Sequence, residues 1–256
     1  MINEHAVIDS SANIADGVTI GPGSIIGANV TIGEGTWIGP HVVIQGPTVI
    51  GKNNKIFQFA SVGNDPQDIT YQGEATRLEI GDNNVIREFC MISRGTVKGG
   101  GVTRLGHHNF LMAYTHVGHD CMVGHHVSMV SYSALSGHVI VDDYATIGAY
   151  SAVHQFCKIG AYAFITRGTY ITKDVLPYVM ISGQDTTVYG INTVGLKRRG
   201  ISSSAIDVLR RAYKIIFRKG LTVQQALVDL DALVLDCPEV SLMIDALKQS
   251  TRGIVR

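Results

Sequence analysis

The sequence predicts a mostly β fold: a parallel β-helix of hexapeptide repeats followed by a small α-helical C-terminal domain. Aliphatic residues recur at every sixth position, from Ile8 to Val62, from Ile80 to Ile92 and from Leu105 to Ile171. This period fits neither the 3.6 residues per turn of an α-helix nor the two-residue alternation of an open sheet. Glycine is frequent, with 29 residues, and helical spacing begins only after the repeat ends.

The repeat predicts a triangular prism in which three hexads make one coil. Each aliphatic residue points inward, and successive coils stack at the strand spacing of about 4.8 Å. Glycine often follows the aliphatic residue, as at Gly21 and Gly33, and we expect a sharp corner there that favours backbone angles costly for other residues. A second inward position, four residues after the aliphatic one, has room only for small side chains. It is held by Ala12, Val18, Ser24, Val30, Thr36, Val42 and Thr48.

Two segments interrupt the repeat, near 63–79 and 93–104, and the second is rich in glycine. Loops that leave a regular scaffold often carry function, although a tolerated insertion is the simpler alternative. The β-helix with these two excursions is predicted to fill residues 1–184.

Residues 185–256 are predicted to form the helical domain. Helical spacing starts near Ser202 and stops at Gly220, with Ile206, Leu209 and other apolar residues on one face. Thr222 and Gln225 form a capping-box pair that begins a second helix, and a third is predicted from Pro238. The apolar faces of these helices are most simply explained by packing.

Composition narrows the functional classes. Cys90, Cys121 and Cys157 fall on the small inward position, so we expect buried apolar roles, and the absence of close cysteine pairs argues against disulfides. Lys plus Arg equals Asp plus Glu at 21 each, which gives no reason to expect nucleic-acid binding or attraction to anionic membranes. No secretory segment or membrane-spanning run is evident, so a cytoplasmic protein is predicted.

Three histidines share one face of the predicted prism. His119, His138 and His154 lie one to three residues into hexads that follow one another on three successive coils. We therefore expect them to stack within about 10 Å. Six other histidines lack this registration and are expected to be ordinary solvated side chains. They are His5, His41, His107, His108, His125 and His126.

Imidazoles on one face can serve as a general base or as metal ligands. Asp120 next to His119 supplies a possible orienting carboxylate, and Gly137 supplies an unobstructed N–H for a developing oxyanion. This combination favours acyl transfer. A zinc enzyme with three histidine ligands, similar to the gamma class of carbonic anhydrases, is the alternative.

Five motifs carry a more specific resemblance. They are residues 116–121, 136–139, 153–157, 195–200 and 250–253, and Tyr213 accompanies them. In these motifs the chain resembles, over almost its whole length, the acyl-carrier-protein-dependent UDP-N-acetylglucosamine O-acyltransferases that begin lipid A synthesis. The hexad alone is common to many acyltransferases, whereas the ordered set of motifs is specific.

The resemblance implies a left-handed β-helix, although the general rule for parallel crossovers would predict the right hand. It implies a homotrimer with active sites between subunits, acyl carrier protein as donor, a UDP-sugar as acceptor, and no metal or cofactor. His119 would be the general base for the sugar 3-hydroxyl, Asp120 would orient it, and the Gly137 N–H would stabilise the oxyanion. Substrate contacts would come from Asp68, His116, His138, His154 and Gln155, and nucleotide contacts from Asn192, Arg198 and Arg199.

Arg167 replaces a glycine or methionine at the position thought to set acyl-chain length in this family. We therefore expect a shorter 3-hydroxyacyl donor.

Several acceptor positions depart from the family pattern. Thr70 stands where lysine is usual, Ser93 where histidine is usual, Val194 where glutamate is usual, and Gln184 where asparagine is usual. The acceptor therefore stays open, with a paralog that uses a UDP-diaminosugar or another nucleotide sugar as an alternative.

Overall fold

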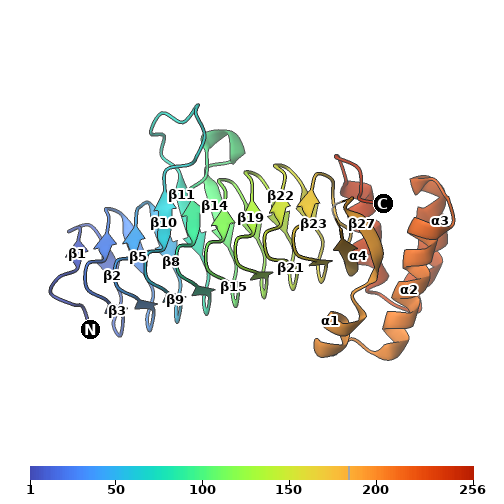
Figure 1. Ribbon diagram of the computed structural model, residues 1–256, viewed down its shortest axis with the longest axis horizontal. Helices are drawn as coiled ribbons and strands as arrows, with labels where there is room; N and C mark the ends of the chain where they lie inside the picture. Colours follow the sequence, from blue (N-terminus) through green and yellow to red (C-terminus); the bar gives the residue numbers. More distant parts are fainter. Residues whose placement is uncertain (184) are drawn as a thin grey trace.

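The computed structural model, which describes residues 1–183 and 185–256, is a left-handed parallel β-helix with helices packed at its C-terminal end (Figure 1). The prism has three sheets, which we number by the order in which the chain first enters them. From β1 to β26, the strands pair in parallel with strands one coil away, as Val117 with Leu135 and Leu135 with Val153, whereas β27 pairs antiparallel with β26. The predicted coil of three hexads is therefore confirmed.

Strands of two to five residues make up each sheet. The first sheet contains β1 (Val7–Ile8), β4 (Ile25–Ile26), β7 (Val43–Ile44), β10 (Ser61–Asn64), β13 (Met91–Ser93), β16 (His116–Val117), β19 (Ala134–Leu135), β22 (Ala152–Val153) and β25 (Tyr170–Ile171). The second contains β2 (Asn13–Ile14), β5 (Val30–Ile32), β8 (Thr48–Ile50), β11 (Arg77–Ile80), β14 (Val102–Leu105), β17 (Met122–Val123), β20 (Ile140–Val141) and β23 (Lys158–Ile159). The third contains β3 (Thr19–Ile20), β6 (Trp37–Ile38), β9 (Lys55–Ile56), β12 (Val85–Ile86), β15 (Phe110–Leu111), β18 (Ser128–Met129), β21 (Thr146–Ile147), β24 (Phe164–Ile165), β26 (Val179–Ser182) and β27 (Thr187–Ile191).

The core is the predicted column of aliphatic side chains. Every hexad aliphatic from Ile20 to Ile171 is buried, whereas Ile8 and Ile14 are half-buried because they lie in the first coil of the described residues, which packs against a coil on one side. Cys90, Cys121 and Cys157 are buried as predicted, and Cys237 is buried as well. Burial raises the pKa of all four thiols.

The predicted reason for glycine after the aliphatic residue is wrong. Gly21 and Gly33 have no left-handed backbone; instead, the next coil passes so close that a side chain has no room. A Cβ on Gly21 would lie 2.6 Å from the backbone nitrogen of Pro40. Left-handed backbone occurs at the corner itself, three residues after the aliphatic residue, where the chain uses Asn, His, Phe and Tyr as well as glycine.

Aromatic rings at these corners stack from coil to coil. One row lies between the third and first sheets, with ring centroids 4.7 to 5.1 Å apart, and contains Phe59, Phe89, Tyr114, Tyr132 and Tyr150. A second row lies between the second and third sheets and contains His108, His126, Tyr144 and Tyr162. His108 is exposed, as predicted, and His126 is half-buried, but both rings are part of a stack that the prediction of solvated side chains did not include.

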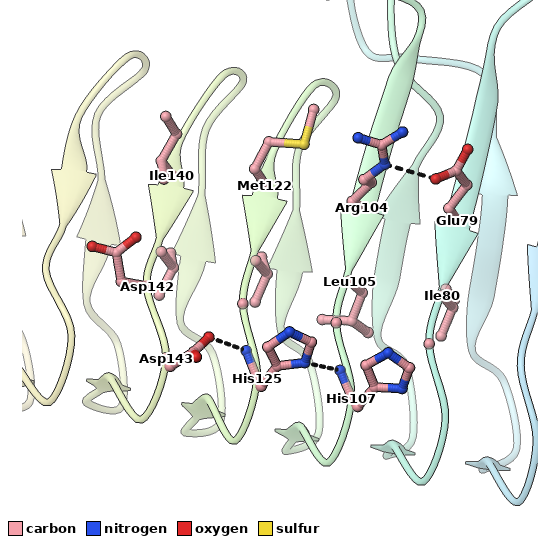
Figure 2. Close-up of a pocket in the computed structure, with 15 residues that line it drawn as sticks. Glu79, Ile80, Arg104, Leu105, His107, Met122, His125, Ile140, Asp142 and Asp143 are labelled. Atoms are coloured by element: carbon pink, nitrogen blue, oxygen red, sulfur yellow. Dashed lines mark hydrogen bonds and ion pairs between the residues drawn. The ribbon is translucent and has the colours of Figure 1, made fainter.

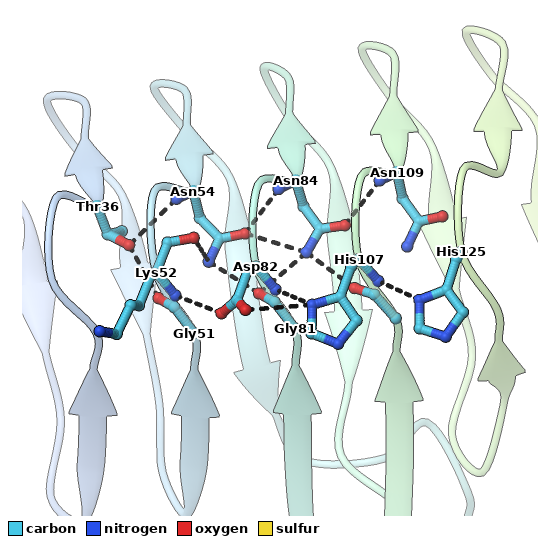
Figure 3. A network of polar contacts seen from close by, with 11 residues as sticks. Thr36, Gly51, Lys52, Asn54, Gly81, Asp82, Asn84, His107, Asn109 and His125 are labelled. Atoms are coloured by element: carbon cyan, nitrogen blue, oxygen red, sulfur yellow. Dashed lines mark hydrogen bonds and ion pairs between the residues drawn. The ribbon is translucent and has the colours of Figure 1, made fainter.

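An asparagine ladder occupies the small inward position in the middle of the prism (Figure 3). Asn84 Nδ2 donates to the carbonyl of Gly106 at 2.9 Å, and its Oδ1 accepts from the backbone N–H of Asn109 at 2.8 Å. Asn54 Oδ1 accepts from the N–H of Asn84 at 2.9 Å in the same way. Each buried side-chain amide therefore hydrogen-bonds backbone groups of the neighbouring coil. The prediction that this inward position holds small side chains did not include such hydrogen bonds.

The two excursions leave the same edge of the prism, after β10 and β13 of the first sheet (Figure 1). They span residues 65–76 and 94–101, shorter than predicted because the flanking strands extend into them. The second contains the short 3₁₀-helix η1 (Val97–Gly99).

Arg94 connects the two excursions. Its buried guanidinium donates to the carbonyl of Gly63 at 2.7 Å and to the hydroxyl of Tyr71 at 3.2 Å, and it pairs with Asp65. The base of the first excursion is therefore held by a side chain of the second.

The three predicted helices are present as α2 (Ser203–Arg218), α3 (Val223–Val234) and α4 (Val240–Gln249), and the capping box of α3 is formed. The short helix α1 (Thr193–Arg198) was not predicted. The predicted domain boundary at 184 lies outside the described residues. Beyond α4 the chain returns to the prism, where Ile254 pairs with Asp174. Within the described part of the chain, no helix is both long and apolar enough to cross a membrane.

Candidate active site

His119 and Asp120 lie at the corner that follows β16. His119 Nδ1 is 2.8 Å from Asp120 Oδ2, and their side chains are 16% and 1% exposed. Asp120 is itself the corner residue, with a φ of 60°, a conformation that aspartate adopts more readily than most residues. The left-handed corner turns the carboxylate inward under the imidazole, which stays at the surface.

Thr96 supplies two further hydrogen bonds to this carboxylate. Its backbone N–H donates to Asp120 Oδ1 at 2.7 Å, and its hydroxyl donates to Oδ2 at 2.6 Å. The backbone N–H of Asp120 in turn donates to the hydroxyl of Thr103 at 2.8 Å. Sequence reasoning missed both threonines; the only signal was that Thr96 precedes a glycine-rich run inside an interruption of the repeat.

Gly137 lies one coil beyond His119, and the imidazole covers it. A Cβ at Gly137 would lie 2.5 Å from His119 Cε1, so only glycine leaves space for the ring. Among the described residues, no group accepts a hydrogen bond from the Gly137 N–H. A free backbone donor therefore lies beside the imidazole.

His138 completes the cluster. Its ring is perpendicular to that of His119, with centroids 5.1 Å apart, and its Nε2 is 3.6 Å from Asp120 Oδ2. Burial lowers the pKa of His138, and the nearby Asp120 carboxylate opposes this effect. The far side of the His138 ring stacks on Phe156 at 4.4 Å.

His154, the third histidine predicted on this face, makes its own contacts. Phe156 occupies the position over His138, and His154 instead contacts Arg252, with 3.4 Å between Nδ1 and the guanidinium nitrogen. Gln155, next to His154, is exposed at the same corner.

Three side chains of this corner could reach one metal ion. In the described part of the chain, His119, Asp120 and His138 form the one group whose ligand atoms lie within 4.8 Å of one another. The three-histidine ligand set expected for the zinc alternative is not formed there. Asp120 already accepts hydrogen bonds on both oxygens, which suits a base held by a carboxylate better than a metal ligand.

His116 and Asp68 border the cluster. His116 is half-buried on β16, and burial lowers its pKa, with a smaller effect from the charge of His119. Hydrogen bonds from Thr70 lower the pKa of Asp68, and the charges of Lys98 and His119 add to this. Lys98, which the sequence analysis did not single out, donates from η1 to the Thr70 hydroxyl at 2.9 Å. Lys98 therefore places a positive charge beside Thr70, the position at which the acyltransferase family of the sequence analysis usually has lysine.

The predicted nucleotide-binding residues gather at a different corner, in a cavity of about 410 Å³ between β21, β24 and α1. Arg198 and Arg199 line it, and the Arg199 guanidinium lies 5.0 Å from the Tyr144 ring centroid. Asn192 also lines it, but its side chain accepts from the Gly195 N–H at 3.1 Å as the N-cap of α1 and donates to the Tyr162 carbonyl at 2.9 Å.

Arg167 lies at the third corner. It follows β24 of the third sheet and lines a hollow of about 530 Å³ with Tyr150, Gly168 and Gly183. Within one chain, the predicted site residues are therefore distributed over all three corners of the prism.

The hollow over the second sheet, of about 470 Å³, contains none of the predicted site residues (Figure 2). Arg104 pairs with Glu79 at 2.7 Å. The backbone N–H of His107 donates to His125 Nδ1 at 3.0 Å. The backbone N–H of His125 donates in turn to Asp143 Oδ1 at 2.7 Å. These hydrogen bonds connect successive coils. His125 is exposed, as predicted, and His107 is half-buried, but both rings accept backbone hydrogen bonds that the prediction of solvated side chains did not include.

Comparisons with known proteins agree over the whole chain. A family model described as the second domain of UDP-N-acetylglucosamine O-acyltransferase matches residues 174–255, and one for bacterial transferase hexapeptide repeats matches residues 1–34 and 29–64. The acyl-[acyl-carrier-protein]–UDP-N-acetylglucosamine O-acyltransferase of Pseudomonas entomophila is 52% identical, with 100% of this chain and 99% of that protein covered. The solved structure of LpxA from Acinetobacter baumannii has a TM-score of 0.97 at 50% identity and covers 100% of this chain and 99% of that one. The UDP-N-acetylglucosamine acyltransferase of Francisella novicida has a TM-score of 0.98 at 44% identity, with coverage of 100% and 94%.

Proposed function

Since this chain belongs to the family of acyl-[acyl-carrier-protein]–UDP-N-acetylglucosamine O-acyltransferases, we propose that it transfers a 3-hydroxyacyl group from acyl carrier protein to the 3-hydroxyl of UDP-N-acetylglucosamine, the first step of lipid A synthesis. The observation that carries this proposal is the hydrogen-bonded pair of His119 and Asp120 beside the free N–H of Gly137. A base and an oxyanion donor are the two groups that acyl transfer to an alcohol requires.

His119 is the general base in this proposal. An ionised carboxylate only accepts hydrogen bonds, so the bond to Asp120 assigns a proton to Nδ1 and leaves Nε2 with its lone pair. Nε2 takes the proton of the sugar hydroxyl while the sugar oxygen bonds to the thioester carbonyl carbon. The C–S bond then breaks, and the imidazolium returns the proton to the leaving thiolate. The reaction balances without a cofactor.

The Gly137 N–H stabilises the negative charge that develops on the thioester oxygen. A backbone donor beside the base needs no reorganisation during the reaction, and one such donor typically contributes about 10² to 10³ in rate. His116, His138, His154, Gln155 and Asp68 surround the base on this corner or border it and are the proposed substrate contacts.

A homotrimer explains how one site can use all of these residues. His119, Arg198 with Arg199, and Arg167 lie at three different corners of the prism. Two subunits that pack side by side bring different corners together, so one subunit can supply the base and its neighbour the nucleotide or acyl-chain contacts. We place the reaction in the cytoplasm, which is supported by four cysteines that are all free and buried.

The decisive experiment is a screen of acyl-carrier-protein donors against UDP-sugars with the purified protein. Transfer to UDP-N-acetylglucosamine supports the proposed function. Transfer only to a UDP-diaminosugar would favour the differently specific paralog, for which the changes at Thr70, Ser93 and Val194 are the motivating observation. No transfer to any UDP-sugar would contradict the acyltransferase proposal.

Arg198→Ala and Arg199→Ala are each expected to weaken UDP-sugar binding more than they slow the chemical step. Each loses charge-assisted hydrogen bonds to phosphate, worth about 1.5 to 3 kcal/mol, which corresponds to a loss of roughly tenfold or more in affinity. Competition by UDP measures the change, with the exposed Arg211→Ala as the matched control. Equal competition in all three variants and the wild type would show that these arginines are surface charges only.

Arg167→Gly is expected to shift donor preference toward longer chains. A guanidinium cannot share a dry groove with a hydrocarbon without a desolvation cost, and each methylene left in water forfeits about 0.8 kcal/mol, so the wild type should prefer donors near about ten carbons over fourteen. Competition between donors of different length gives the ratio directly. Equal or better use of the longest donor by the wild type would show that Arg167 does not limit the chain.

A further inference from the structure

Thr96 makes contacts that a residue of an ordinary surface loop does not make. The second excursion folds back over the corner after β16, and Thr96 places a backbone N–H on one oxygen of Asp120 and a hydroxyl on the other. The Thr96 hydroxyl also accepts from the N–H of Gly99 at 3.2 Å as the N-cap of η1, which directs its proton toward the carboxylate.

The turn and the carboxylate fit each other closely. A Cβ at Gly99 would overlap the Asp120 carboxylate, although the backbone of Gly99 is not left-handed. Glycine is therefore required at this position by the approach of Asp120 and not by the turn itself. Asp120 is 1% exposed, so the donors of the excursion replace the water that a surface carboxylate would have.

We propose that Thr96 is a positioning residue that holds the Asp120 carboxylate toward His119, and that the second excursion is therefore part of the catalytic machinery. A buried carboxylate that loses a hydrogen-bond donor tends to turn toward solvent. The hydrogen bond to His119 Nδ1 is then weakened, and the imidazole loses its fixed orientation. The inference rests on the proposed role of His119 as general base.

Thr96→Val removes the hydroxyl and keeps the shape of the side chain. We expect kcat to fall by about 10- to 100-fold, as for the loss of one hydrogen bond to a charged group, while KM for both substrates changes little. Thr96→Ser, which keeps the hydroxyl, is expected to restore most of the activity. Gly99→Ala is expected to reduce kcat at least as much as Thr96→Val.

The matched control is Thr36→Val. Thr36 is a buried threonine in a distant coil whose hydroxyl donates to the Gly51 carbonyl at 3.0 Å, and valine already fills the equivalent position at Val18, Val30 and Val42. A general effect of removing a buried hydroxyl would lower activity in this variant too. Unchanged kcat in Thr96→Val, or equal losses in Thr96→Val and Thr36→Val, would overturn the proposal.

Labelling of His119 with diethyl pyrocarbonate tests the inference independently of acyl transfer. The reagent reacts with the unprotonated ring nitrogen, and a hydrogen bond from Nδ1 to a carboxylate makes Nε2 more nucleophilic. At pH values where the ring is neutral, we expect labelling of His119, located by peptide mass spectrometry, to be slower in Thr96→Val than in the wild type and in Thr96→Ser. Equal labelling rates would contradict the positioning role even if the wild type transfers no acyl group, which would be a failure of the proposed function alone.

Discussion

His119→Ala is expected to lower kcat by about 10²- to 10⁴-fold and to leave the fold intact. The imidazole lies outside the aliphatic column and contacts Asp120 and His138 at the surface of the corner. Its removal takes away the proposed proton acceptor for the sugar hydroxyl, whereas Asp120 keeps both hydrogen bonds from Thr96. Activity is therefore expected to fall without a loss of core packing.

Product formation under saturating donor and acceptor, with circular dichroism to verify the fold, measures the effect. His5→Ala is the matched control, because His5 is a solvated histidine far from the site, at the N-terminal end of the prism. Near wild-type turnover by a folded His119→Ala variant would contradict the proposed role of His119 as general base.

Asn84→Ala is expected to destabilise the prism by about 3 kcal/mol or more. The change removes an amide that donates to the carbonyls of Gly81 and Gly106 and accepts from the N–H of Asn109, all in the interior. Each buried backbone group left without a partner costs about 1 to 3 kcal/mol, and alanine leaves a cavity as well.

Thermal unfolding measures this effect, and a midpoint lower by roughly 6 to 12 °C is expected for a chain of this size. Asn13→Ala is the matched control, because Asn13 lies on the outer face of β2 and is exposed. Equal midpoints for the two variants would mean that the ladder does not stabilise the native state as its hydrogen bonds indicate.

The repeating part of the fold could be predicted because each hexad obeys one local rule. An aliphatic residue at every sixth position defines the inward face, and its position follows from counting, whatever the neighbouring coils contain. The helices α2 to α4 were predictable for the same reason, from helical spacing and from the capping pair Thr222 and Gln225.

Contacts between neighbouring coils could not be predicted from the sequence of a single hexad. Gly21 is required by the backbone of a residue one coil away, and Phe156 stacks on the ring of His138 by a contact across coils. The partnership of Thr96 with Asp120 joins an irregular loop to a corner, and no periodic pattern connects the two positions. The contact between His119 and Asp120 was predictable because the two residues are adjacent in sequence.

The return of the C-terminal segment to the prism has a consequence for the order of folding during synthesis. Almost every other contact of the β-helix joins a residue to one in the preceding coil, so coils can form in sequence as the chain leaves the ribosome. The pairing of Ile254 with Asp174 instead joins residues 80 positions apart, so it can form only after the helices have been synthesised. His154 contacts Arg252 from the same segment, so a chain cut before Arg252 is expected to build the prism but to leave His154 without this neighbour.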